Sequence, residues 1–280
     1  MLQHLNNKVI IVTGAGAGGG FGKVISEKCA AGGAKVVCVD VNNESLDEVV
    51  EGIRANGFDA IAHSADVTDM AEVKAAARHA LDTFDAIDVL VNNAGLMPLA
   101  YFADHERASE KWHRAIDVNI KGVVNGISAV YDQMIGQGRG QIVNISSIYG
   151  NYGIEGAGVY GATKAAVTAI SESLRVEAQG KIKVTIVRPT GVLGTSLANS
   201  IVNEKAIMGM VAHKGRQFAE NFRNFQHGSL LPSQVDVNST QYWLITADDL
   251  AEAVVHVINQ PWGINLSDIT VRATGENYVY

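Results

Sequence analysis

Residues 13–22 read TGAGAGGGFG, and this glycine-rich stretch decides the fold. It follows the apolar run VIIV at 9–12 and leads into KVISEKCAAGG, which has the spacing of an amphipathic helix. A glycine-rich turn between a strand and a helix lets backbone N–H groups approach a pyrophosphate at the positive end of the helix dipole. The stretch therefore predicts a nucleotide-binding turn that opens an α/β fold.

The glycines of this stretch allow two readings of the nucleotide-binding pattern. Gly14, Gly18 and Gly20 fit one spacing, whereas Gly14, Gly20 and Gly22 fit the pattern with a two-residue insertion. The distance to the following helix favours the second reading. We therefore expect Gly14, Gly20, Phe21 and Gly22 to contact the cofactor.

The rest of the chain alternates short β-branched runs with longer amphipathic stretches. This alternation predicts an α/β fold, a Rossmann-type doubly wound parallel sheet of about seven strands, in a single domain over 1–280. The expected strands are 9–12, 35–40, 60–64, 89–92, 141–145, 183–187 and 269–271. The expected helices are 22–31, 45–56, 70–84, 113–136, 158–178 and 247–259.

One region departs from the alternation. Residues 195–243 carry Gly, Asn and His among isolated apolar residues and lack a sustained helical period. Loops this long inside a compact domain are usually functional. We predict that 195–243 forms a lid over the substrate.

The composition excludes several classes of protein. Of the 280 residues, 47% are hydrophobic and 18% charged, so the chain has ample material for a buried core. A net charge of −7 with scattered basic residues argues against nucleic-acid binding. No apolar window approaches the roughly 20 residues of a membrane span, and the first residues lack a signal-peptide pattern. We expect a cytoplasmic protein with no membrane partner and no metal site.

An acidic residue, Asp40, closes the second expected strand in VVCVDVN. It stands about 20 residues beyond the glycines, where a carboxylate accepts hydrogen bonds from the adenosine ribose hydroxyls. Neither the glycine-rich turn nor residues 41–43 offer an Arg or Lys to neutralise a 2′-phosphate. Asp40, with Val41 beside it, therefore predicts NAD as the cofactor.

A second acidic residue, Asp66 in SADVTD, follows the third expected strand. Its carboxylate has two interpretations: it hydrogen-bonds the adenine amino group, or it caps the next helix. We assign Asp66 and Val67 to the cofactor site.

The strongest chemical signal is the pair Tyr160 and Lys164 in VYGATKAA, preceded by Ser146 and Ser147 in IVNISS. Four residues apart on a helix, Tyr and Lys share one face, and a nearby ammonium favours the phenolate, which lowers a pKa that starts at about 10. Such a tyrosine exchanges protons near neutral pH, next to a serine hydroxyl that holds a substrate oxygen. Hydride transfer between a carbinol carbon and nicotinamide requires this arrangement.

With these motifs the chain resembles the short-chain dehydrogenase/reductase family over nearly its whole length. The resemblance is carried by TGAGAGGGFG, by Asp66-Val67, by NNAG at 92–95, by DVNIKG at 117–122, and by YGATK with its upstream serine. The family's spacing implies that Ser147, 13 residues before Tyr160, is the catalytic serine.

The resemblance also assigns further roles. It implies that Asn93 and Gly95 lie under the cofactor, and that Lys164 and Tyr160 contact it as well. It implies that Asn119 holds a water that links Lys164 to solvent as a proton relay.

Two stretches depart from the family pattern. After the sixth expected strand the chain reads VRPTGVLGT at 187–195, where the family usually has Pro-Gly and a Thr five residues after the Pro. Pro189 and Val192 still match cofactor positions, and we assign Thr195 to the cofactor although it is displaced. The chain closes with INLSDITVRATGENYVY, where the family more commonly has a strand followed by Asp-Gly-Gly.

These features predict an NAD-dependent oxidoreductase that interconverts a secondary alcohol and a ketone, with Tyr160 as general acid/base. We expect Met97, Tyr149, Tyr152 and Thr190 to line a roomy apolar substrate pocket. No Arg stands out as a carboxylate clamp, so we expect a bulky aromatic or alicyclic alcohol. The lid residues Met208, Met210, Phe218, Phe222 and Phe225 either line this pocket or pack in the core.

Two other function classes compete with this one. A dehydratase or epimerase with a retained cofactor would use the same Tyr and Lys, but such relatives usually carry a longer C-terminal substrate domain. A non-catalytic NAD-sensing protein would be expected to lose one of Ser147, Tyr160 or Lys164. The family resemblance also implies a homo-oligomer, for which we expect a tetramer built on 113–136 and 158–178.

Overall fold

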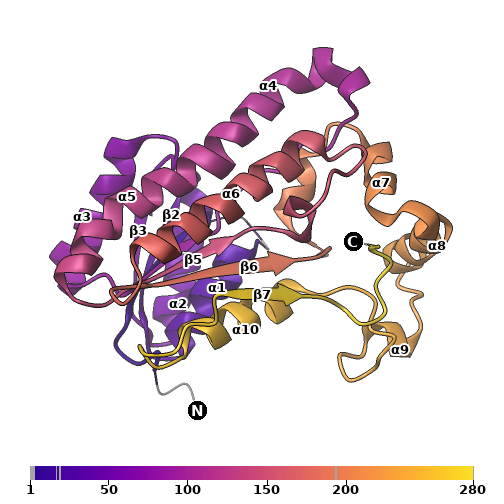
Figure 1. The fold of residues 1–280 in the computed structure, drawn as a ribbon. Coiled ribbons are helices and arrows are strands. Elements are labelled where there is room, and N and C mark those ends of the chain that lie inside the picture. Colours follow the sequence, from indigo (N-terminus) through magenta and orange to yellow (C-terminus); the bar gives the residue numbers. More distant parts are fainter. Residues whose placement is uncertain (1–3, 17, 19, 193, 280) are drawn as a thin grey trace.

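A central parallel sheet organises the protein (Figure 1). The computed structural model describes residues 4–16, 18, 20–192 and 194–279. Within these residues the sheet has seven strands in the order β3-β2-β1-β4-β5-β6-β7, and every strand pair is parallel. The strands are β1 Val9–Thr13, β2 Lys35–Asp40, β3 Ala60–Ser64, β4 Val89–Asn92, β5 Gln141–Ile145, β6 Lys183–Pro189 and β7 Asp268–Val271.

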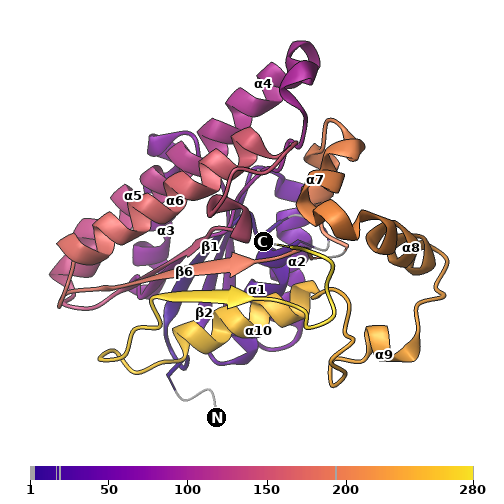
Figure 2. The same ribbon diagram turned by 45° about the vertical axis from the view of Figure 1, so that its right-hand side comes forward.

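Helices cover both faces of the sheet (Figures 1 and 2). One face carries α1 Phe21–Ala31, α2 Asn43–Ala55 and α10 Ala247–Ile258. The other carries α3 Met70–Phe84, α4 His105–Ile116, α5 Gly122–Gly136 and α6 Gly158–Glu177. Burial on both faces of the sheet explains the continuous apolar run Val9–Val12 of β1. The predicted Rossmann-type α/β fold is confirmed.

The helix expected at 113–136 is longer and interrupted. It begins as α4 at His105, passes through a π-helical turn at Asp117–Lys121, and continues as α5. The first half of α4 buries only Ala108 among charged neighbours, so its apolar period is too weak to read from the sequence. The expected start at 113 was therefore wrong.

The lid segment, which we define as residues 195–243, lies beyond the carboxyl ends of the strands (Figures 1 and 2). It contains α7 Met208–Val211, α8 Gly215–Gln226 and α9 Pro232–Val235, with 3-10 turns at Ser196–Ser200, Glu204–Ile207 and Ala212–Lys214. The expectation that it lacks a sustained helical period was wrong for α8. Phe218, Phe222 and Phe225 follow helical spacing there, and their rings pack in succession.

The order of the strands reverses between β1 and β4, whose register pairs Val12 with Val91. At such a reversal the loops after the two strands diverge and leave a crevice at the carboxyl edge of the sheet.

The described residues include no helix of the length and apolarity that a membrane span demands.

Candidate active site

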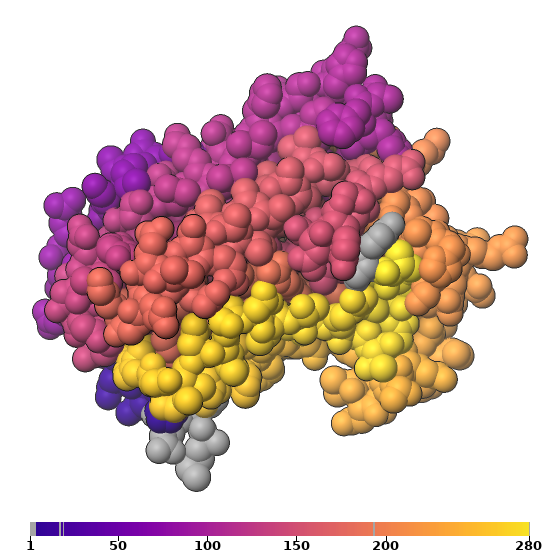
Figure 3. Space-filling view, in the orientation of Figure 1, coloured from indigo at the N-terminus to yellow at the C-terminus, as the bar shows by residue number. Residues whose placement is uncertain are grey.

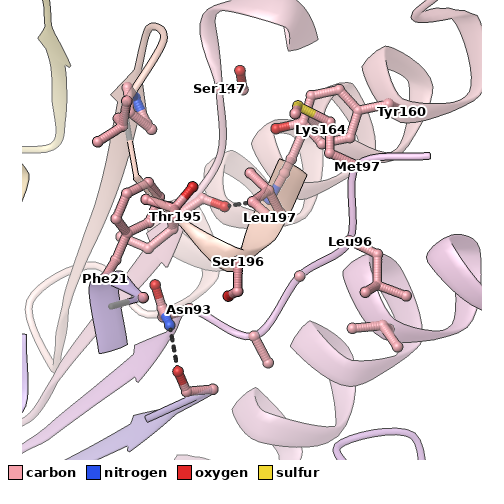
Figure 4. Close-up of a pocket in the computed structure, with 18 of the residues that line it drawn as sticks. Phe21, Asn93, Leu96, Met97, Ser147, Tyr160, Lys164, Thr195, Ser196 and Leu197 are labelled. Atoms are coloured by element: carbon pink, nitrogen blue, oxygen red, sulfur yellow. Dashed lines mark hydrogen bonds between the residues drawn. The ribbon is translucent and has the colours of Figure 1, made fainter. Parts of the chain in front are cut away.

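A cavity of about 390 Å³ opens at this carboxyl edge (Figure 4). It extends from the ends of β2 and β3, past the glycine-rich loop, to the start of α6. Most residues assigned from the sequence line it: Gly14, Gly20, Phe21, Asp40, Val41, Asp66, Val67, Asn93, Gly95, Met97, Ser147, Tyr149, Tyr160, Lys164, Pro189, Thr190, Val192 and Thr195. The fold therefore brings together residues from the ends of six strands.

The glycine-rich loop requires glycine at two positions. Gly14 has φ of +68°, and a Cβ on it would lie 2.9 Å from Ala94 Cα. A Cβ on Gly22 would lie 2.1 Å from the carbonyl oxygen of Gly14, so α1 packs directly on the loop. For Gly18, no heavy atom of the described residues comes within 4 Å of such a Cβ. This geometry favours the reading with Gly14, Gly20 and Gly22.

Asn93 ties the end of β4 to the glycine-rich loop. Its Nδ2 donates to the carbonyl oxygens of Thr13, at 2.9 Å, and Gly14, at 3.2 Å. Its Oδ1 is buried and has no hydrogen-bond partner in the described part of the chain. A buried unpaired acceptor is costly, so this atom is suited to a donor group on a ligand.

Asp40 faces the cavity while it organises the backbone around it. Its Oδ2 accepts from the N–H of Gly16 and its Oδ1 from the N–H of Asn42, both at 3.0 Å. Each carboxylate oxygen keeps further acceptor capacity. The carboxylate is thus fixed in orientation beside the space at the end of β2.

Asp66 does not cap the helix that follows it, because Asp69 is the cap of α3. Instead Asp66 Oδ2 accepts from Arg114 Nη2 at 2.8 Å, and its Oδ1 accepts from the N–H and hydroxyl of Thr68. Burial acts to raise the pKa of Asp66, but the hydrogen bonds from Arg114 and Thr68 outweigh it and hold the pKa below its usual range. Arg114 also lines the cavity, and no sequence motif had pointed to it.

Tyr160 and Lys164 share one face of α6, and both are buried. Burial raises the pKa of Tyr160 to about 12, although a hydrogen bond with Ser147 opposes the shift. The expectation that Lys164 brings this pKa towards neutrality was wrong. The ammonium Nζ lies 5.9 Å from the centroid of the Tyr160 ring, and the loss of solvent around the phenol dominates.

Lys164 is fixed by the end of β5. Its Nζ donates to the carbonyl oxygen of Ile145 at 2.8 Å, and burial lowers its pKa to about 8. Ser146, the neighbour of the catalytic candidate, bonds the carbonyl oxygen of Lys164 at 2.9 Å and the hydroxyl of Thr168. Ser146 thus supports the backbone of α6, while Ser147 presents its hydroxyl towards Tyr160.

Asn119 lies behind the cavity wall, in the π-helical turn, and is 1% exposed. Its Nδ2 donates to the carbonyl oxygen of Leu96 at 2.9 Å and to Thr163 Oγ1 at 3.0 Å, while its Oδ1 accepts from the N–H of Leu96 at 2.8 Å. The side chain therefore fastens the loop after β4 to α6.

The substrate candidates separate into two groups. Met97, Tyr149 and Thr190 line the cavity, whereas Tyr152 lies outside it and is 60% exposed. Of the lid residues considered from the sequence, Met210 reaches the cavity. Figure 4 shows residues 195–197 between Phe21 and Asn93 on one side and Tyr160 and Met97 on the other.

Sequence reasoning missed several lining residues. Gly191, Ser196, Ala198 and Tyr278 belong to the cavity wall. Tyr278 is far from every motif in the chain, and only the tertiary fold brings it to the site.

Comparison with known proteins agrees with this architecture. Residues 8–206 match the family model described as short chain dehydrogenase. An uncharacterised oxidoreductase of Listeria monocytogenes is 33% identical over 276 residues, which cover 97% of this chain and 98% of that protein.

Solved structures give the same result. A short chain dehydrogenase/reductase of Burkholderia phymatum, solved in complex with NAD, is 27% identical with a TM-score of 0.74, over 95% of this chain and 89% of that one. An alcohol dehydrogenase of the archaeon Thermococcus sibiricus, complexed with 5-hydroxy-NADP, has the same fold with a TM-score of 0.77 at 22% identity, over 98% of this chain and 100% of that one.

The doubly wound sheet and these relatives define an oxidoreductase of Rossmann type. The chain belongs to the short-chain dehydrogenase/reductase family, as its motifs predicted.

Proposed function

We propose that the protein is an NAD-dependent oxidoreductase that interconverts a secondary alcohol and a ketone. The observation that carries this proposal is the presence of Ser147, Tyr160 and Lys164 in the same cavity as Asp40. A proton-exchanging group and a ribose acceptor at opposite ends of one cavity suit an extended dinucleotide with its reactive ring beside Tyr160.

The donor set fits a dinucleotide. Gly14, Gly20 and Phe21 line the cavity at the start of α1, where backbone N–H groups would meet a pyrophosphate, and the unpaired Asn93 Oδ1 offers a buried acceptor. We propose that Asp40 accepts from the ribose hydroxyls and repels a 2′-phosphate. In the described part of the chain the basic residues that line the cavity are Arg114, which is paired with Asp66, and Lys164, which bonds Ile145. This distribution favours NAD over NADP.

The proposed reaction divides between proton and hydride. When bound, NAD supplies the acceptor for the hydride that leaves the carbinol carbon. Ser147 donates to the substrate oxygen and orients it, and Tyr160 Oη takes the hydroxyl proton in oxidation or returns it in reduction. Lys164 supplies a positive charge and a ribose anchor beside this phenol.

We further propose that the π-helical turn at Asp117–Lys121 serves the proton path. The side chain of Asn119 is committed to Leu96 and Thr163, so a water at this residue would bind its backbone carbonyl. π-helical turns alter the backbone hydrogen-bond ladder and are frequent at functional sites.

The substrate we propose is a bulky apolar alcohol, aromatic or alicyclic. Apolar and aromatic side chains pack around the Tyr160 ring: Met97, Tyr149, Met210 and Tyr278 form one cluster with it, and all four line the cavity. Residues 195–198 and Met210 come from the lid segment, and we propose that they exclude water from the reacting atoms. We propose that the lid segment and the rest of 1–280 form a single domain.

A variant series tests the reaction. Tyr160→Phe keeps the ring and removes the acid/base group, so turnover on an alcohol panel with NAD should fall by at least ~100-fold while NAD affinity survives. Lys164→Ala should reduce turnover and cofactor affinity together. The matched control is Tyr152→Phe, which removes a hydroxyl outside the cavity. Activity near the wild-type level in the Tyr160 variant would refute the mechanism.

The same assay separates the competing classes. An oxidoreductase forms one NADH for each alcohol oxidised. A dehydratase or epimerase with a retained cofactor would convert substrate without net NADH, and an NAD-sensing protein would bind NAD and turn over nothing.

A further inference from the structure

The chain returns to the cavity after its last strand. Residues 272–279, which we call the tail, leave β7 and place Tyr278, 8% exposed, in the cavity wall. Figure 3 shows these yellow residues side by side with the orange lid segment and the red residues that precede α6. The tail thus lies between two segments that border the site.

One glycine makes room for Tyr278. A Cβ on Gly191 would lie 2.0 Å from Tyr278 Oη and 2.1 Å from its Cε2, so any other residue at 191 would displace the ring. Gly191 stands in the Pro-Thr-Gly stretch that departs from the family pattern. The two stretches of sequence that depart from the family pattern, 187–195 and the end of the chain, therefore contact each other where Gly191 meets Tyr278.

The residue before this glycine holds the tail. Thr190 Oγ1 donates to Glu276 Oε2 at 2.5 Å, and Glu276 is also paired with Arg272. Beside it, Asn277 Oδ1 accepts from the indole N–H of Trp243 at 2.7 Å. Hydrogen bonds at the two residues before Tyr278 therefore hold the tail, and Arg272 Nη2 donates to the carbonyl oxygen of Tyr278 at 3.3 Å.

The ring of Tyr278 contacts both borders of the site. Its centroid lies 6.1 Å from that of Tyr149, two residues after Ser147, and 5.9 Å from that of Phe218 on α8. Edge-to-face and tilted rings at these distances attract one another. The phenol is nearly enclosed, and burial raises its pKa.

We propose that Tyr278 is a specificity-determining residue: its ring, seated on Gly191, forms the wall that limits the size of the substrate's apolar group. This inference rests on the proposed function, since it assumes that an alcohol or ketone reacts beside Tyr160. Removal of the ring enlarges the pocket, so bulkier ketones should gain relative to small ones.

The first experiment measures selectivity. For Tyr278→Ala, the ratio of kcat/KM for a bulky alicyclic ketone to that for a small one should rise by at least ~10-fold, while NADH affinity measured by fluorescence stays within twofold. Tyr278→Phe should keep the wild-type ratio, and Tyr152→Ala is the control for loss of an exposed tyrosine. A ratio unchanged in Tyr278→Ala would overturn the inference.

A second experiment tests the seat without any turnover. Gly191→Ala should lower the thermal midpoint in the wild-type background and change it little in the Y278A background, because the three atoms nearest to such a Cβ all belong to the Tyr278 phenol. An equal decrease of the thermal midpoint in both backgrounds would contradict the inference that the Tyr278 ring packs on Gly191. A wild type inactive on every alcohol and ketone would instead overturn the proposed function, and this cycle would still decide whether Tyr278 is seated on Gly191.

Discussion

Burial controls the proton chemistry of Tyr160 and Lys164. Desolvation penalises the charged form of each group, so it raises the pKa of the phenol to about 12 and lowers that of the ammonium to about 8. A neutral phenol is ready to donate a proton to a ketone oxygen. In the opposite direction it must first lose its own proton.

Alcohol oxidation should therefore accelerate with alkali. Because the pKa of Tyr160 lies at about 12, the ionised fraction of its phenol increases with pH throughout the range below 12. The kcat for oxidation should therefore climb from about pH 7, and the climb should become less steep above about pH 8, where Lys164 loses its positive charge. Ketone reduction uses the protonated phenol and should gain nothing over this range. Initial rates in both directions at constant ionic strength check this. An oxidation optimum at or below neutral pH would contradict it.

Asp40 should control the choice between the two dinucleotides. Asp40→Asn keeps the shape and removes the charge that opposes a 2′-phosphate, so the ratio of kcat/KM for NAD to that for NADP should fall at least ~10-fold, for which ~1.4 kcal/mol of relieved repulsion suffices.

Asp47→Asn on α2 is the matched control for this change. Asp47 is exposed and lies outside the cavity, so this variant removes one negative charge and should leave the NAD to NADP ratio unchanged. A wild type that already prefers NADP would invalidate the assignment of Asp40.

At the scale of elements, the lid segment has two parts. Residues 195–198 and Met210 line the cavity, whereas Trp243, 1% exposed, is held by the tail through Asn277. The first part is positioned to respond to a ligand and the second is anchored.

Hydrogen exchange should distinguish these parts. When NAD and a substrate analogue are both bound, amides of 195–211 should slow, because the ligands cover them and restrict their opening. Amides of 232–243 should change little and serve as the internal control. Equal protection of 195–211 with and without ligands would show a fixed wall.

The sequence predicts those parts of the site that depend on short spacing. The glycine loop next to β1, Asp40 at a strand end, and Tyr160 with Lys164 one helical turn apart are local patterns. Arg114 and Tyr278 left no such signal, because each reaches the cavity only through packing between distant segments. The pKa of Tyr160 was misjudged for the same reason, since burial is a tertiary property.

At the scale of the whole molecule, the active-site candidates lie at one edge of the sheet, and none of them lies on the outer face of α6. Small residues there are exposed: Ala162, Ala165 and Ala169. Val176 on the same helix and Val124 on α5 are exposed as well. Small side chains allow two helices to approach closely in an isologous contact.

We therefore propose that a homo-oligomer buries this face, and for its size we keep the tetramer that the family resemblance implies. Sedimentation should give a tetramer at micromolar concentration, and Ala169→Arg should shift it to smaller species because an arginine prevents close helix approach. The control is Ala55→Arg on α2, at another exposed position. A monomeric wild type would contradict the proposal.

The contact between Gly22 and the carbonyl of Gly14 also sets how the loop tolerates genetic variation. Position 22 is closed to every side chain, since even a methyl group would meet that oxygen at 2.1 Å, and Gly14 is closed by its positive φ. Position 18 faces open space. Neutral drift can therefore change the residue at 18 and the loop's surface properties, while 14 and 22 remain glycine in any descendant that keeps this turn.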